Sequence, residues 1–265
     1  MNVAVVAAGV TIAIAAAVRS TWSPCGLSML AQITPIAETG RGQRFARTAA
    51  WFVAGAALGG LCLGGLMALG AIAVRATGIG DTAAIALMLA AALVAAAVDA
   101  RVLGSGPPFL RRQVNENWLS NYRSWVYGAG FGWQIGTGVA TYVMTAAVFL
   151  AIVIGVTSAS PSLAIAIGCT FGVVRGLAVL IGFPLRTTAA LLEFHRRFDA
   201  WSEPVRRAVI AVQLGVAVVL ALLVAPAFVA ASVSVVAVCI LAVSVAPDRN
   251  GSRHARVTRA GEVAR

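Results

Sequence analysis

The chain has 265 residues, of which 60% are hydrophobic and 11% are charged, and its mean hydropathy is +0.91. Soluble domains of this length are far less apolar, so the composition argues against a soluble enzyme and predicts an all-α integral membrane protein whose immediate partner is the lipid bilayer. The formal net charge of +11 is carried by arginine alone and is spread over several loops, which argues against a nucleic-acid interface.

About seven stretches are long and apolar enough to cross a bilayer, given the roughly 20 residues that a membrane helix needs. In chain order they cover residues 3–37, 48–74, 82–103, 124–156, 162–185, 205–224 and 228–246. The first and the fourth contain helix breakers and are predicted to be broken helices. The proline between the last two leaves a second description open, in which they form one bent hairpin.

The break in the first span follows from a Ser-Pro-Cys-Gly sequence. Pro24 removes a backbone hydrogen-bond donor and Gly26 loosens the next turn, so a helix is expected to stop here and to restart further along. Backbone that is broken at membrane depth is tolerated only where protein or a watery cavity covers it. We therefore expect Arg19, Trp22 and Cys25 to lie beside a protected interior site.

The loops alternate in charge along the chain. Arginines are concentrated after the first, third and fifth spans and in the tail, whereas the loops between them carry little or no charge. The positive-inside rule then places the N-terminus outside and the C-terminus in the cytoplasm. The sequence thus predicts a multi-pass protein of the inner (cytoplasmic) membrane, with a cytoplasmic loop at 104–123 and a basic, disordered cytoplasmic tail at 247–265.

The cytoplasmic segment 186–204 has a helical period of its own. Leu191, Phe194, Phe198 and Trp201 recur at steps of three and four, opposite charged residues. This periodicity predicts one amphipathic helix that lies in the headgroup layer.

The two broken spans indicate an internal repeat. The fourth span is interrupted by Gly-Trp-Gln-Ile-Gly-Thr-Gly, and its Trp133 aligns with Trp22 of the first. Because the two spans cross in opposite directions, residues 1–103 and 124–225 are predicted to be an inverted pair of three-helix units, with 226–246 as an extra transmembrane helix. Chance recurrence of tryptophan and glycine is the alternative.

Glycines with GxxxG spacing occur in the second and fifth spans. They are Gly55, Gly59, Gly60 and Gly64 in the second span and Gly168, Gly172 and Gly176 in the fifth. Small residues at this spacing let helices approach closely, so these spans are expected to pack tightly.

The sequence resembles the CcdA/DsbD transmembrane family, whose members carry thiol reducing equivalents across the membrane. The resemblance rests on the Ser-Pro-Cys sequence that ends at Cys25, on the aligned break at 132–133, and on the three-plus-three inverted arrangement. In that family each broken helix carries one cysteine beside a proline, and the two cysteines accept and pass on electrons. Cys25 matches the first, whereas Gly136 occupies the position of the second.

The resemblance implies a membrane thiol-disulfide oxidoreductase. Such a protein moves reducing equivalents from a cytoplasmic thioredoxin-like donor to an extracytoplasmic acceptor, for instance in cytochrome c maturation. Cys25 is then the reactive thiol, and Cys62, near the middle of the second span, is its candidate partner. The sequence contains no CxxC pair and no metal-ligand motif, so neither a metal nor another cofactor is predicted.

Two arginines at membrane depth point to the same region. Charges at such a depth are rare and face a cavity or the bundle interior, and the sequence places no acidic residue deep in a span to neutralise Arg19 or Arg175. Two cations in one crevice would favour an anion or a thiolate. The residues expected to line this crevice and bind substrate are Arg19, Trp22, Trp133, Gln134, Thr137 and Arg175.

Two other functions remain open. One is a transporter of a small anion, including a sulfur-containing one, that uses Arg175 and the two broken helices in alternating access. The other is a membrane assembly subunit with no transport of its own.

Overall fold

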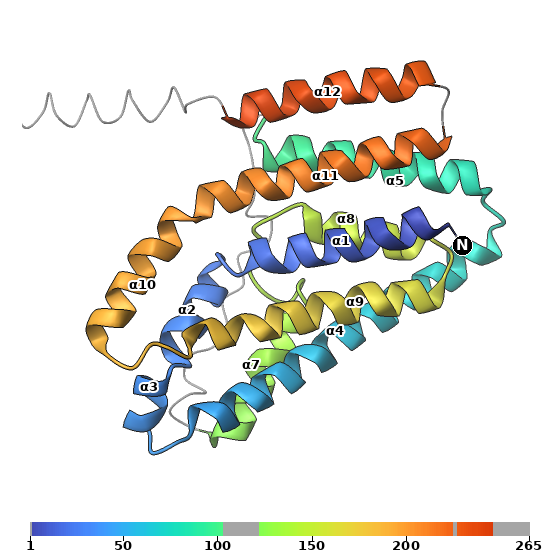
Figure 1. The fold of residues 1–265 in the computed structure, drawn as a ribbon. Helices are drawn as coiled ribbons and strands as arrows, with labels where there is room; N and C mark the ends of the chain where they lie inside the picture. Colours follow the sequence, from blue (N-terminus) through green and yellow to red (C-terminus); the bar gives the residue numbers. More distant parts are fainter. Residues whose placement is uncertain (1, 103–121, 225–226, 246–265) are drawn as a thin grey trace, which may run out of the picture.

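The computed structural model describes residues 2–102, 122–224 and 227–245. Its helices are α1 (Val3–Ser20), α2 (Pro24–Gln32), α3 (Pro35–Gly40), α4 (Phe45–Ala76), α5 (Asp81–Asp99), α7 (Ser124–Gly136), α8 (Ala147–Thr157), α9 (Pro161–Leu177), the 3-10 helix η1 (Ala178–Gly182), α10 (Thr188–Ala200), α11 (Ser202–Val224) and α12 (Ala227–Val245). No strand occurs in this described part of the chain (Figure 1). The predicted all-α class is confirmed.

Five of the described helices are individually long and apolar enough to cross a membrane, namely α1, α4, α5, α9 together with η1, and α11. Two shorter apolar helices accompany them, α8 and the segment Val233–Ala242 within α12. A multi-pass membrane protein is therefore confirmed, whereas the expected count of seven is reached only if α7 with α8, and α12, each make a crossing. The predicted tail at 247–265 and most of the predicted loop at 104–123 lie outside the described residues.

Helix α4 is the central packing element, because it lies between α7 and α9. A β-carbon built on Gly60 would lie 2.4 Å from the carbonyl oxygen of Gly168, and one built on Gly136 would lie 2.1 Å from that of Ala56. Backbone therefore touches backbone on both sides of α4, which only glycine permits. The expected tight packing at the glycine-rich spans is confirmed.

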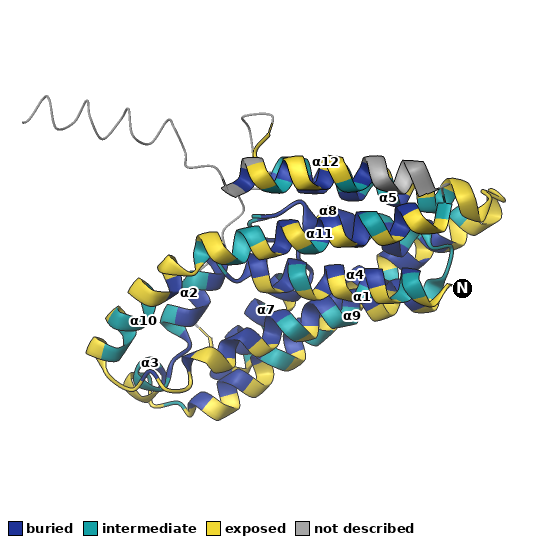
Figure 2. Cartoon of the chain, turned by 45° about the horizontal axis from the view of Figure 1, so that its top comes forward, coloured by how far each residue is buried: buried dark blue, intermediate teal, exposed yellow. Residues whose placement is uncertain are grey.

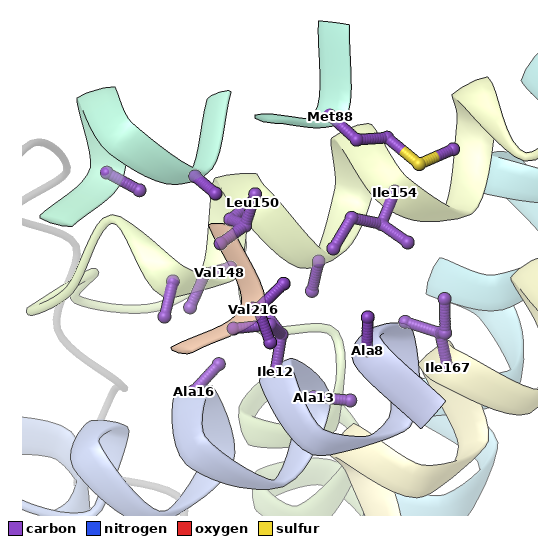
Figure 3. Packing of buried hydrophobic residues seen from close by; sticks show 14 of the residues in the cluster. Ala8, Ile12, Ala13, Ala16, Met88, Val148, Leu150, Ile154, Ile167 and Val216 are labelled. Atoms are coloured by element: carbon purple, nitrogen blue, oxygen red, sulfur yellow. The ribbon is translucent and has the colours of Figure 1, made fainter. Parts of the chain in front are cut away.

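Helix α1 lies against α8, α9 and α11. Ile12 and Ala16 of α1 are fully buried and belong to one apolar cluster with Ile154 of α8 and Ile167 of α9 (Figure 3). The outer faces of the helices are exposed instead (Figure 2). They carry large apolar side chains, among them Leu66 on α4, which is 67% exposed. Such a surface is stable only against lipid or protein.

The first span is broken as predicted and then broken a second time. The hydroxyl of Ser23 caps α2 by accepting a hydrogen bond from the Gly26 amide at 3.2 Å, and Pro24 occupies the first helical position. The predicted span then divides again at Thr34, whose hydroxyl caps α3 in the same way, with Pro35 next. The second interruption was not predicted, although a threonine followed by proline is a sequence signal for the start of a helix.

The fourth span is also broken as predicted, but the break lies further along the chain. Helix α7 continues through the Gly-Trp-Gln sequence and ends at Gly136, and α8 begins only at Ala147. Gly138 adopts a φ of +68°, which favours glycine, directly after the end of α7.

The predicted amphipathic segment forms a helix but not a single one. Helix α10 ends at Ala200, and the chain turns at Trp201 into α11. Phe198 is buried against the bundle, whereas Trp201 is 62% exposed. The residues expected to form one apolar face therefore have different surroundings: Phe198 packs on the bundle, and Trp201 lies in an exposed turn.

Candidate functional site

Arg175 on α9 points into the break between α1 and α2. Its guanidinium Nη2 donates to the carbonyl oxygen of Ser20 at 3.4 Å and to the hydroxyl of Ser23 at 3.3 Å. The side chain is 2% exposed, and its Nε and Nη1 have no hydrogen-bond partner among the described residues. The protein thus holds a buried cation with spare donors at the first break, which is a strong attraction for an anionic group.

Cys25 lies in the first turn of α2, beside this guanidinium. Its thiol is 3% exposed and is close enough to Arg175 to interact with it electrostatically. The first turn of a helix also carries a partial positive charge. The thiol and the guanidinium thus lie together at the first break, and the nucleophilic form of a cysteine is its thiolate.

Cys62 does not share this site, contrary to its expected role as the partner of Cys25. It lies on an outer face of α4 and is exposed, whereas Cys25 is buried, and the two do not form a disulfide. The neighbouring Gly60 faces α9, so the helical rotation that brings the glycines to the helix contact turns Cys62 outwards. Position along an apolar span does not determine the direction of a side chain, which depends on the rotation of the helix.

Phe171 connects the two breaks. The Arg175 guanidinium carbon lies 5.8 Å from the centre of the Phe171 ring, and a β-carbon built on Gly138 would lie 2.8 Å from the same ring. Arg175 therefore contacts one face of a ring that is packed against the second break. The interruptions are on the same side of α9, in the interior of the bundle, and are separated by one aromatic side chain.

The remaining expected crevice residues are placed unevenly. Trp22 lies in the first break and Thr137 is 9% exposed at the end of α7, so both are near the interior. Trp133 is 45% exposed, and Gln134 is partly exposed on the same helical turn. Because Trp133 and Gln134 are exposed to this extent, they do not line the enclosed space that the sequence predicted for them.

Arg19 points away from Arg175, so the expectation of two cations in one crevice is wrong. It is 6% exposed, and its Nη1 donates to the hydroxyl of Ser202 at 3.4 Å. It lines a cavity of about 20 Å³, roughly the space of one water molecule, together with Asp99 and with Met144 from the second break. Arg19 is thus near the second break, through the cavity that it shares with Met144.

Asp99 is a buried acid that the sequence reading missed. It is 5% exposed at the end of α5, and it attracts Arg19 electrostatically. Its carboxylate accepts hydrogen bonds from the Thr145 hydroxyl, from the Ala146 amide at 2.8 Å and from the Gln213 side-chain amide at 2.9 Å. The expectation that no acid neutralises Arg19 is therefore wrong. Gln213, a glutamine in an apolar span, was the sequence signal that could have revealed this polar site.

A second buried carboxylate anchors α3. Glu38 is fully buried and forms an ion pair with Arg41 at 2.8 Å. It also accepts hydrogen bonds from the Thr48 hydroxyl on α4 and from the Tyr127 hydroxyl on α7 at 2.8 Å. This network fixes the segment that follows Cys25 to the central helices.

Replacement of Asp99 by alanine is expected to lower the free energy of unfolding by about 2 kcal/mol, because three buried donors lose their acceptor. Asp81, at the exposed start of the same helix, is the matched control, and its replacement by alanine should cost no more than about 0.5 kcal/mol. Denaturant unfolding in detergent micelles measures both values. Equal losses in the two variants would contradict a stabilising role of the Asp99 network.

No group of three histidine, cysteine, aspartate or glutamate side chains is gathered closely enough to hold a metal ion within residues 2–102, 122–224 and 227–245. The reactive groups buried in this part of the chain include the thiol of Cys25, the guanidinium of Arg175 and the carboxylates of Glu38 and Asp99.

Comparison with known proteins gives one informative similarity. Over 173 residues the chain is 32% identical to the methylamine utilization protein MauF of Paracoccus versutus, and the match covers 64% of this chain and 62% of that protein. The chain therefore matches less than two thirds of the length of this relative. No family model matches the sequence, and no solved structure matches it closely. The similarity is thus to a methylamine utilization protein and does not identify the CcdA/DsbD family.

Proposed function

We propose that this membrane protein, similar in part to MauF, is a thiol relay that passes reducing equivalents across the bilayer through Cys25, in the manner of the CcdA/DsbD family that its sequence resembles. The observation that carries the proposal is the unpaired Arg175 guanidinium beside Cys25. A cation fully enclosed in a membrane protein without a carboxylate partner is costly, so it is expected to serve a negatively charged group. A thiolate at Cys25 is such a group.

One thiol is sufficient for the relay, although the family has two. The Cys25 thiolate attacks a disulfide of the extracytoplasmic acceptor, so that a mixed disulfide forms and one acceptor sulfur leaves as a thiolate. A thiolate of a reduced, thioredoxin-like donor then attacks the Cys25 sulfur and releases the second acceptor thiolate. The second thiol of the donor finally displaces Cys25, which leaves an oxidised donor, a reduced acceptor and the original Cys25 thiolate.

The wider architecture is part of the proposal. The arginine-rich ends suggest an inner-membrane orientation with the N-terminus outside, and the two interior breaks suggest an inverted repeat of residues 1–103 and 124–225. The close pairing of α4 with α9, each of which follows a broken span, supports this division. Methylamine utilization is the proposed setting, because the relative is a protein of that process.

A trapping experiment tests the relay. In a variant with Cys62, Cys169 and Cys239 replaced by serine, Cys25 is first converted to a mixed disulfide with 5-thio-2-nitrobenzoate. A reduced thioredoxin that lacks its resolving cysteine is then expected to attack the Cys25 sulfur, release thionitrobenzoate and form a disulfide-linked adduct, because no second thioredoxin thiol displaces Cys25. Non-reducing electrophoresis detects the adduct, and Cys25→Ser in the same background is the control. If thioredoxin variants and reconstituted acceptor thiol proteins all fail to form an adduct with Cys25, the relay is refuted.

Anion transport is the second candidate, and the two spare donors of Arg175 favour it. A small anion would take the place that the thiolate takes in the relay. Vesicle flux that survives Cys25→Ser and is lost in Arg175→Ala would decide for transport.

A further inference from the structure

The segment that carries Cys25 is held by an aromatic contact with α10. The ring of Trp22, three residues before Cys25, is stacked on Phe198 with the ring centres 4.3 Å apart and the planes inclined by only 7°. The indole N–H of Trp22 also donates to the backbone carbonyl of Phe198 at 2.7 Å. We call this contact the Trp22–Phe198 latch.

The inner side of α10 extends the same contact. Phe194 lies 5.3 Å from Phe198, and both belong to an apolar cluster with Met29 and Leu30 of α2. Figures 1 and 2 both show α10 beside α2, at the end of the bundle where α3 lies. The latch therefore connects α10 to the broken part of the first span.

The outer side of α10 is charged and exposed. Glu193 pairs with Arg196 at 2.6 Å and with Arg197, and hydrogen bonding from Arg197 lowers the pKa of Glu193 below its usual value. The helix is also bounded by two turns, one at residues 183–187 and one at Trp201. An element with a single packed face between two turns opens at a lower free-energy cost than the interior helices do.

The burial of Cys25 makes such an opening necessary. A thiol that is 3% exposed cannot meet the sulfur of another protein, because disulfide exchange requires direct contact between the sulfur atoms. Arg175 of α9 lies on one side of the break that carries Cys25, where it donates a hydrogen bond to Ser23. The Trp22–Phe198 latch holds α10 against the same break.

We propose that α10 is a gate for Cys25 and that the Trp22–Phe198 latch keeps it closed. When the latch opens, Trp22 is released, the first break can rearrange, and Cys25 becomes accessible to a protein thiol on the arginine-rich side of the bundle. This inference rests on the proposed relay, because it describes how the same thiol is reached.

The gate is tested by the rate at which a water-soluble maleimide alkylates Cys25 in nanodiscs, with the other three cysteines replaced by serine. Phe198→Ala is expected to raise the rate about tenfold, since a stacked aromatic contact and its burial are lost and the open population rises. Leu192→Ala, on the exposed side of the same helix, is the matched control and should leave the rate within about twofold of the parent protein. Trp22→Phe keeps an aromatic ring but loses the indole hydrogen bond, so an intermediate increase of about threefold is expected.

Several outcomes distinguish this inference from a general loss of structure and from the relay itself. Unchanged circular dichroism and an unchanged thermal midpoint in Trp22→Phe, with faster alkylation, support the gate even if Phe198→Ala unfolds. Equal alkylation rates in the parent protein, Phe198→Ala and Trp22→Phe overturn it. Because alkylation needs no partner protein, a responsive gate without any trapped thioredoxin adduct would refute the relay and leave the gate intact.

Discussion

Replacement of Gly60 by leucine is expected to destabilise the bundle by more than about 3 kcal/mol, at or beyond the upper end of ordinary overpacking. A β-carbon at this position would lie 2.4 Å from the carbonyl oxygen of Gly168 and 2.8 Å from the α-carbon of Gly172. Both obstacles are backbone atoms of α9, so no side-chain rotation relieves the clash. The helices must separate, and the apolar contacts along α4 and α9 are lost with them.

Gly65 is the matched control on the same helix, because no atom lies within 4 Å of a β-carbon built there. Leucine at this position should keep or slightly raise the stability, by up to about 1 kcal/mol, since glycine is a poor helix former. Thermal unfolding in detergent micelles, followed by circular dichroism, compares the two variants. A similar midpoint for both would show that the contact between α4 and α9 is not the packing centre of the fold.

Replacement of Arg175 by methionine is expected to slow the reaction of Cys25 with disulfides and maleimides at neutral pH by about 100-fold. A cation in a poorly polarisable interior stabilises a nearby thiolate, and methionine fills similar space without charge. The measurement belongs in the Phe198→Ala background, where opening of α10 does not limit the rate. Arg175→Lys, which keeps the charge but has fewer donors, should recover part of the rate.

The same substitution should make the protein more stable rather than less. Two guanidinium nitrogens of Arg175 are buried and find no hydrogen-bond partner in the part of the chain that the structure describes, so methionine removes a poorly satisfied charge from the interior. Greater stability together with lower reactivity is the expected signature of a residue retained for function. Unchanged reactivity in Arg175→Met would exclude a role for Arg175 at Cys25, and lower stability would assign it a structural role.

Several features of the fold were predictable because they depend on local sequence. The apolar spans follow from composition over lengths of 20 residues or so, and the breaks follow from Pro24 and from the glycine-rich end of α7. The glycine spacing predicted close helix packing at α4 and α9, because a face without side chains lets another helix approach, although it did not say which helices meet. Arg175 was identifiable in the same way, since a charge in an apolar span has few possible locations.

The direction of each polar side chain was not predictable in this way. Arg19 and Arg175 look alike in the sequence, yet Arg19 faces Asp99 and the second break while Arg175 faces Cys25. Cys62 and Cys25 both occur in apolar spans, yet Cys62 is exposed and Cys25 is buried. The pairing of Trp22 with Phe198 joins residues 176 positions apart and has no sequence signal of its own.

The amino-acid sequence by itself determined that this chain is a helical membrane protein, where its helices stop, and which residues are too polar or too small for their positions to be incidental. These properties follow from local backbone chemistry and from the cost of polar groups in an apolar solvent. Only the tertiary structure decided which of those residues meet. Rotation of a helix about its axis is set by all its neighbours together, and this rotation placed the guanidinium of Arg175 against the thiol of Cys25 and turned the other cysteines away.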